Sequence, residues 1–173
     1  AGISAWKNFR FLNKNSIGIE ISNPGHDNKY KKFSKKQINS VLKLSKFLIK
    51  RYRVKSNFIL GHSDIAPDRK KDPGEKFPWK FLSKNKIGYW HDLNQNFISK
   101  KRNIKADKED EFKFIQNISK IGYSINYNIA KKQYTKLITK AFQRRFRQEL
   151  INGIIDLECL LISKNLVKKL KFF

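Results

Sequence analysis

The stretch GHSDIAPDRKKDPG, residues 61–74, gathers the residue types from which a metal site can be built. His62 follows a short apolar run directly, and Asp72 comes ten residues later, before a Pro-Gly turn. A neutral imidazole and a carboxylate are both zinc ligands, and a rigid loop can bring such a pair together. The spacing alone also fits a solvated polar loop. The residues by themselves therefore leave a metal site and a charged loop as alternatives.

The other polar side chains of this loop have simpler interpretations when they are taken singly. Asp64 is expected to make turn hydrogen bonds near His62. Arg69 either contacts a substrate carboxylate or is solvated. Lys70 is one of two adjacent lysines in a lysine-rich chain, so its type and position alone assign it no role.

The elements that must position this loop are predicted from hydrophobic periodicity. Residues 16–21 alternate isoleucine with polar residues or glycine, which predicts a strand with one apolar face. Ser34 and Gln37 have capping-box spacing and should open a helix that runs to about Arg53. Residues 58–60 should form a second short strand. A strand, a helix, a strand and then a polar loop predict an α/β arrangement with a mixed central β-sheet flanked by helices.

The second half of the chain has a different pattern. Residues 94–110 are polar and dense in charge, which is typical of a linker. Three segments with helical spacing of apolar residues follow within residues 111–173, the last of them opened by Asp156. We therefore predict a first domain over residues 1–93, a linker over 94–110, and a small C-terminal three-helix bundle over 111–173.

Composition limits the classes of function. The 39 Lys and Arg against 14 Asp and Glu give a net charge of +25, which favours polyanionic partners. The basic residues are spread along the whole chain, however, and no recognition helix or aromatic RNA-binding motif accompanies them, so a specific nucleic-acid partner is not expected. No apolar run is long enough to span a bilayer. The lone Cys159 lies in an apolar helical pattern and is expected to be buried.

Several separated segments, read together, resemble a known enzyme family. AGISAW, SIGIEISNPGH and ILGHSDIAPDRKKDPGEKFPW are similar, in order and spacing, to the zinc-dependent N-acetylmuramoyl-L-alanine amidases of the AmpD/AmiD type (Amidase_2). These enzymes are related to T7 lysozyme and the peptidoglycan recognition proteins. The resemblance covers roughly residues 1–92. AFQRRFRQELINGIIDLE also resembles the helical peptidoglycan-binding module of AmiD-like amidases.

The resemblance implies roles for individual residues. His62 and Asp72 match two of the three zinc ligands of the family, and zinc is the implied cofactor. Glu20 matches the strand glutamate that acts as general base, and Lys70 matches the lysine that stabilises the oxyanion. Arg69 and Trp6 are further candidates for substrate contact, with core packing as the alternative for Trp6.

One feature departs from the family. Its first zinc ligand is a histidine upstream of the AGISAW-like segment, so that third ligand lies before Ala1 and is absent from this sequence. Either His26 or His91 would have to replace it, which we do not expect. Together with the lack of any methionine, this predicts an N-terminally truncated amidase domain with impaired activity.

The predicted function is therefore that of a zinc amidase that cuts the bond between N-acetylmuramic acid and L-alanine in cell-wall turnover or recycling. The alternative is a non-catalytic remnant that binds peptidoglycan. The expected partner is peptidoglycan or a muropeptide, with the protein acting as a monomer in the cell envelope or periplasm, or alternatively in the cytoplasm. The sequence leaves open whether the substrate is the intact sacculus or an anhydro-muropeptide.

Overall fold

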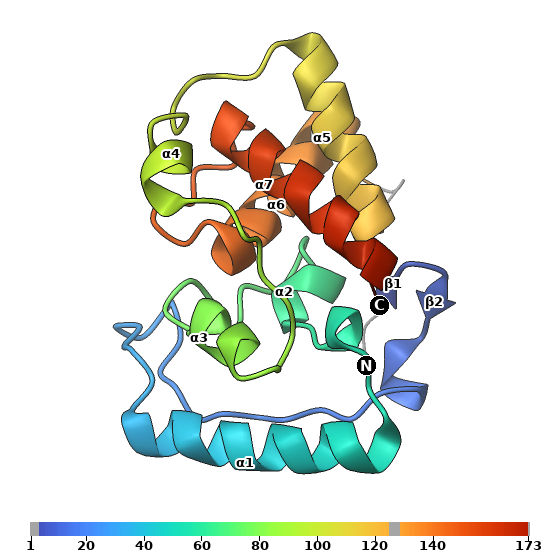
Figure 1. The fold of residues 1–173 in the computed structure, drawn as a ribbon, viewed down its shortest axis with the longest axis vertical. Coiled ribbons are helices and arrows are strands. Elements are labelled where there is room, and N and C mark those ends of the chain that lie inside the picture. Colours follow the sequence, from blue (N-terminus) through green and yellow to red (C-terminus); the bar gives the residue numbers. More distant parts are fainter. Residues whose placement is uncertain (1–3, 125–128, 173) are drawn as a thin grey trace.

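The computed structural model describes residues 4–124 and 129–172 (Figure 1). The described elements are, in chain order, β1 (Ala5–Trp6), β2 (Phe9–Arg10), η1 (Leu12–Lys14), α1 (Lys35–Tyr52), η2 (Ser56–Phe58), α2 (His62–Ile65), α3 (Trp79–Lys84), α4 (Gln95–Ser99), α5 (Lys108–Ile121), α6 (Lys131–Phe146), α7 (Leu157–Lys169) and η3 (Leu170–Phe172). Figure 1 shows α1 along one end of the molecule and α5, α6 and α7 together at the other, with the short helices α2 and α3 between them.

Helix α1 begins and ends where the sequence predicts. The Ser34 hydroxyl accepts a hydrogen bond from the Gln37 backbone N–H at 3.2 Å, and the Gln37 side chain accepts one from the Ser34 N–H at 2.9 Å. This reciprocal pair satisfies two donors that a helix start leaves open. The helix ends at Arg53 in the left-handed conformation. Its apolar face packs into a small cluster of buried residues: Ile38, Val41, Phe77, Trp79, Leu82 and Ile87.

The two predicted strands are not formed. Residues 16–21 and 59–60 carry no strand assignment, and residues 56–58 form the 3-10 helix η2. In the described part of the chain the only sheet pairs β1 with β2, antiparallel, with Ala5 opposite Arg10 and Trp6 opposite Phe9. A strand exists only where a neighbour pairs with its backbone. Residues 16–21 have the alternating residue types of a strand, but no described segment lies beside them to pair with their backbone.

The C-terminal helical bundle is confirmed. Helix α5 packs against α7, and their apolar faces enclose a core with α6 that includes Phe114, Phe142 and Leu166. Asp156 caps α7 as predicted, because its carboxylate accepts a hydrogen bond from the Cys159 N–H at 2.9 Å. Cys159 is buried, also as predicted.

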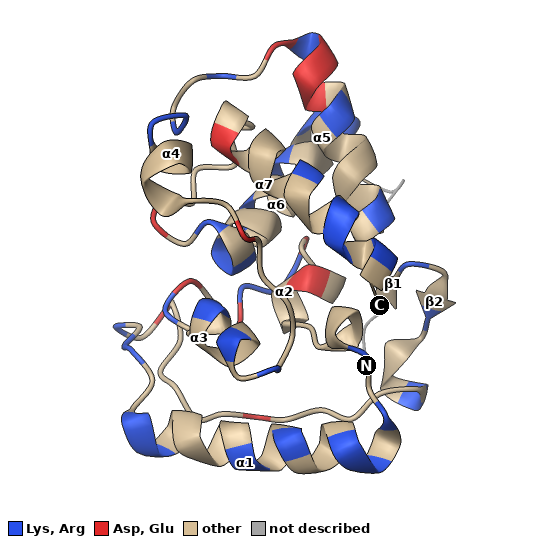
Figure 2. Ribbon diagram, viewed as in Figure 1, with Lys and Arg blue, Asp and Glu red and all other residues tan. Residues whose placement is uncertain are grey.

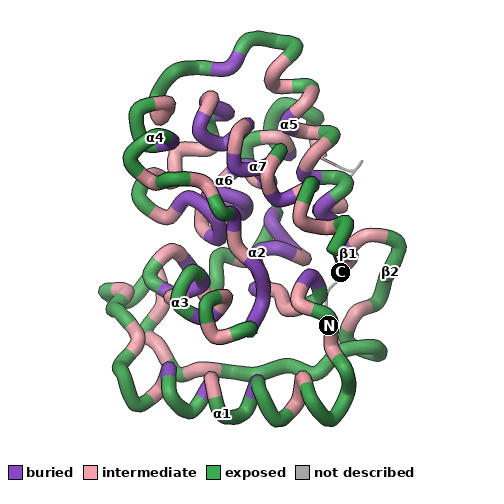
Figure 3. The backbone as a smooth tube through the Cα atoms, viewed as in Figure 1, coloured by how far each residue is buried: buried purple, intermediate pink, exposed green. Residues whose placement is uncertain are grey.

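The core does not stop at the predicted domain borders. Trp6 and Tyr89 belong to the same buried cluster as the C-terminal helices, and Gly122 lies so close to Trp6 that an added Cβ would come within 2.4 Å of its ring. Within residues 94–110, Ile98 of α4 is fully buried in this cluster. Figure 3 shows buried backbone continuing from the centre of the molecule into the helical bundle. The division into a domain over residues 1–93, a linker over 94–110 and a second domain over 111–173 stays a prediction.

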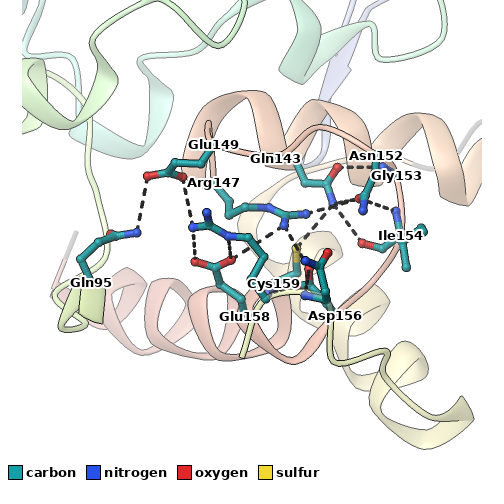
Figure 4. Close-up of polar contacts among 12 residues, drawn as sticks. Gln95, Gln143, Arg147, Glu149, Asn152, Gly153, Ile154, Asp156, Glu158 and Cys159 are labelled. Carbon is teal, nitrogen blue, oxygen red and sulfur yellow. Dashed lines mark hydrogen bonds and ion pairs between the residues drawn. The ribbon is translucent and has the colours of Figure 1, made fainter. Parts of the chain in front are cut away.

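A second buried feature of the bundle is polar. Arg147 has no exposed side-chain surface, and its Nη1 lies 3.0 Å from the Asp156 carboxylate and 3.8 Å from that of Glu158 (Figure 4). Glu158 is also fully buried and accepts two hydrogen bonds from Arg102, at 2.6 and 2.9 Å. Two guanidinium groups, that of Arg147 buried and that of Arg102 partly exposed, thus face two buried carboxylates and compensate their charge.

Candidate functional site

The loop over residues 61–74 brings its two candidate metal ligands together. His62 begins the one-turn helix α2, and the His62 Nδ1 lies 3.1 Å from the Asp72 Oδ2. The backbone holds this approach, because the Ser63 N–H donates to the Asp72 carbonyl oxygen at 2.9 Å. The two side chains are 40% and 61% exposed. They are therefore close to each other and accessible from solvent.

This donor pair fits part of a zinc site. An imidazole nitrogen and a carboxylate oxygen are both suitable ligands, and a catalytic zinc site has three protein ligands and one open position. In residues 4–124 and 129–172, no group of three His, Cys, Asp or Glu side chains is arranged to hold a metal ion. The loop thus supplies two converging candidate ligands.

The other two histidines have different surroundings. The His26 Nε2 lies 3.0 Å from the Glu75 Oε2, and its ring stacks on Tyr30 at 4.4 Å between centroids. His91 is buried, and this burial, with the nearby charge of Lys80, lowers its pKa to about 4. Among the described residues, neither histidine belongs to a group of three potential metal ligands.

Tyr30 and His26 close the end of the loop. The Tyr30 hydroxyl donates to the Pro73 carbonyl oxygen at 2.6 Å and accepts from the Lys76 N–H at 3.0 Å. Burial raises the pKa of Tyr30 to about 12, so it remains a neutral donor. Gly74 has φ of +81°, and a Cβ there would meet Tyr30 at 2.5 Å, which explains the glycine at this turn.

The remaining predicted site residues are less closely gathered. Glu20 is exposed in the stretch between η1 and α1, and Lys70 is half-buried in the loop. Among the described residues, no hydrogen bond or ion pair joins either side chain to His62 or Asp72. Arg69 is exposed, and its backbone N–H donates to the Ala66 carbonyl oxygen at 3.2 Å.

Trp6 lies in the core with 1% of its surface exposed. Its Nε1 donates to the Asn57 carbonyl oxygen at 3.2 Å, and its ring packs edge-on against Tyr123. This burial favours the core-packing interpretation over substrate contact.

Asp64 makes the turn hydrogen bond expected from the sequence and two contacts that the sequence did not suggest. Its Oδ2 accepts from the Gly61 N–H at 2.8 Å. Its carboxylate also accepts from the Tyr123 hydroxyl at 2.7 Å and forms a buried ion pair with Arg145 of α6. Arg145 could have been noticed from the sequence because it stands between Phe142 and Phe146, so that a charged residue lies beside the buried face of a helix.

The basic residues do not single out one binding face. Figure 2 shows Lys and Arg along α1, α5 and α7, at both ends of the molecule. The basic residues are thus spread over several elements in space as well as along the sequence. None of the described helices is both long and apolar enough to cross a membrane.

Comparisons with known proteins agree with this geometry. The Amidase_2 family, described as N-acetylmuramoyl-L-alanine amidase, matches residues 3–75. The N-acetylmuramoyl-L-alanine amidase AmiD of Escherichia coli K12 is 35% identical over 175 aligned residues, which cover 98% of this chain and 63% of that protein. This chain thus spans less than two thirds of the length of that relative.

Solved structures extend the similarity to the fold. The complex of E. coli AmiD with anhydro-N-acetylmuramic acid-L-Ala-D-γ-Glu-L-Lys has a TM-score of 0.84 at 34% identity, over 97% of this chain and 67% of that one. AmpDH3 from Pseudomonas aeruginosa in complex with an anhydromuramic pentapeptide has a TM-score of 0.83 at 32% identity, over 98% and 68% of the two chains. These matches confirm the expected fold class, including its helical C-terminal part.

Proposed function

This chain belongs to the N-acetylmuramoyl-L-alanine amidase (Amidase_2) family, and from that premise we propose that it hydrolyses the amide bond between N-acetylmuramic acid and L-alanine in peptidoglycan or its fragments. The observation that carries the proposal is the approach of His62 to Asp72 at 3.1 Å, within the residues that match the family. The pair is of the right chemical types and is open to solvent.

His62 and Asp72 would hold a zinc ion as two of its protein ligands. The loop fixes them before any metal arrives, because the Ser63 N–H ties the two halves of the loop together. A zinc ion in this place supplies a Lewis acid for the amide carbonyl and makes the attacking water more acidic. The third protein ligand is the part of the centre that the described residues leave unassigned.

Glu20 and Lys70 carry the proton and charge steps of the proposal. The Glu20 carboxylate would take a proton from the attacking water and pass it to the departing amine of L-alanine, while a C–O bond forms and the C–N bond breaks. The Lys70 ammonium would stabilise the negative charge that develops on the carbonyl oxygen. Arg69, exposed in the same loop, would bind a carboxylate of the stem peptide. The family resemblance supports the roles of Glu20 and Lys70, and the loop position supports that of Arg69.

The C-terminal helices would contribute to holding the cell-wall substrate. The similarity to AmiD runs through them, since the aligned region covers 98% of this chain. The net charge of +25 suits stem peptides, which carry carboxylates. An enzyme with this substrate would act as a monomer in the cell envelope, with the cytoplasm as the alternative if recycled anhydro-muropeptides are its substrate.

The test combines zinc binding with product analysis. Zinc titrated into the 173-residue chain and followed by calorimetry should bind weakly, as expected of two ligands, and His62→Ala and Asp72→Ala should each abolish the signal. Asp68→Ala, in the same loop, is the matched control and should bind like the unchanged chain. An affinity that is unchanged in His62→Ala would refute the metal assignment.

For the reaction, the chain is incubated with excess zinc and with either intact sacculi or an anhydro-muropeptide, and mass spectrometry follows the release of L-Ala-containing peptide. Release from one substrate and not the other identifies the substrate class. If a muropeptide binds but no product is released, the chain is not an amidase, and the alternative of a non-catalytic peptidoglycan-binding module takes its place.

A further inference from the structure

Arg145 is a buried charge that the proposed mechanism does not use. It lies on α6, in the last turn, with 1% of its surface exposed, and it pairs with Asp64, which is 81 residues earlier and equally buried. Taking a guanidinium and a carboxylate out of water is costly unless both are paired and hydrogen-bonded. The contacts of this buried pair show which segments of the chain it holds together.

Asp64 connects three separate segments of the chain. Its carboxylate accepts hydrogen bonds from the Gly61 N–H in its own loop, from the Tyr123 hydroxyl after α5, and from the Arg145 guanidinium on α6. Burial, and secondarily the Asp64 charge, raises the pKa of Tyr123 well above its usual value, so this hydroxyl remains a donor. The carboxylate is thereby fixed by donors from both the loop and the helical bundle.

Arg145 also contacts the chain on the other side of His62. Its Nη2 donates to the Ile59 carbonyl oxygen at 2.6 Å, three residues before His62, while Nη1 binds Asp64, two residues after it. The guanidinium plane lies over the Trp79 ring at 4.2 Å, which restricts its orientation. The planar guanidinium group of Arg145 thus binds the chain both before and after His62, through its two terminal nitrogens.

The position of α2 in turn sets the position of Asp72. The Ser63 N–H donates to the Asp72 carbonyl oxygen, so a shift of α2 moves both residues of the pair or breaks this bond. There is little free space for such a shift, because even a Cβ on Gly61 would come within 2.8 Å of Pro73 and 3.2 Å of Trp79.

We propose that Arg145 is a positioning residue for the His62–Asp72 pair, and that through it the C-terminal helices set the geometry of the metal ligands. The proposal rests on the proposed function, in which this pair holds the metal. It assigns the helical bundle a part in the active centre that is distinct from binding the cell wall.

The test compares Arg145→Lys with Arg147→Lys. The two arginines are two positions apart, both are buried, and both are ion-paired, but Arg147 contacts Asp156 and Glu158 in the bundle and not the loop. Lysine keeps the charge and loses the two-ended geometry in each case. Circular dichroism first shows that each variant is folded. Tyr123→Phe, which removes one donor to Asp64 and no charge, provides a milder variant if Arg145→Lys does not fold.

Two measurements report on the loop itself. One is the ¹⁵N chemical shift of the His62 imidazole at fixed pH, and the other is hydrogen exchange of the Ser63 amide relative to amides in α1. In Arg145→Lys we expect at least tenfold faster exchange at Ser63 and a changed His62 shift, with zinc affinity at least tenfold weaker. In Tyr123→Phe the same changes should be smaller. Arg147→Lys should leave all three measurements at the loop unchanged.

Unchanged Ser63 exchange and His62 shift in a folded Arg145→Lys protein would overturn the proposal, and so would equal changes in Arg147→Lys, which would indicate general loosening. The shift and exchange measurements require neither zinc nor turnover. If the unchanged chain fails to bind zinc through His62, the proposed function fails, while these two measurements still decide whether Arg145 positions the pair.

Discussion

Replacement of Arg147 by methionine should show how strongly the buried ion network stabilises the helical bundle. In the folded protein the Arg147 guanidinium lies 3.0 Å from the Asp156 carboxylate, and its side chain has no exposed surface. Arg147→Met leaves two buried carboxylates facing one guanidinium, that of Arg102. Removal of one partner of a buried ion pair costs about 3–5 kcal/mol, because the other charge stays buried without compensation.

The assay is urea unfolding followed by circular dichroism, with linear extrapolation to water. In a thermal melt of a chain of this size, about 2–4 °C of melting temperature correspond to 1 kcal/mol, so the melting temperature should fall by roughly 6–20 °C. Lys164→Met, on the exposed face of α7, removes the same charge without burial and should change stability by less than about 0.5 kcal/mol.

A double-mutant cycle tests the cause of the loss. Asp156→Asn removes the unpaired charge and keeps an N-cap for α7, since asparagine caps as well as aspartate does. The double variant should therefore be more stable than the sum of the two single losses implies, by about 1–3 kcal/mol. A loss below about 1 kcal/mol in Arg147→Met, or two losses that add within about 0.5 kcal/mol, would refute the account of a mutually dependent buried network.

Two further predictions concern buried titratable groups. Burial lowers the pKa of His91 from 6.5 to about 4, so this side chain is neutral in the folded protein at neutral pH. In the unfolded chain it takes up a proton near pH 6.5. Its contribution to the free energy of unfolding is therefore present above pH 6.5 and is lost as the pH falls toward 4. At about 1.36 kcal/mol per pH unit, the difference between the two pKa values corresponds to about 3 kcal/mol. Between pH 7 and pH 4.5, the His91→Gln variant should therefore lose less stability than the unchanged chain, as measured by urea unfolding. Equal losses in the two proteins would contradict the assignment. Burial raises the pKa of the Cys159 thiol to about 12. Its reaction with a thiol reagent at pH 8 should accordingly be roughly 100-fold slower in the folded chain than in urea, and comparable rates would show that α7 opens readily.

The sequence by itself determined the features that depend on nearby residues. The capping box of Ser34 and Gln37 and the cap of Asp156 involve side chains and backbone groups three residues apart, so their spacing alone predicts them. The pairing of His62 with Asp72 was predictable because both belong to one short loop whose motif resembles that of a family.

Only the tertiary structure decided the features that depend on distant neighbours. Residues 16–21 alternate like a strand, but no described segment pairs with their backbone, and pairing is what makes a strand. Burial of Arg145 and Arg147 could not be predicted from residue type, since arginine is usually exposed. Their charges are compensated because Asp64, 81 residues from Arg145, and the carboxylates at the start of α7 meet them inside the core, where folding alone brings opposite charges together.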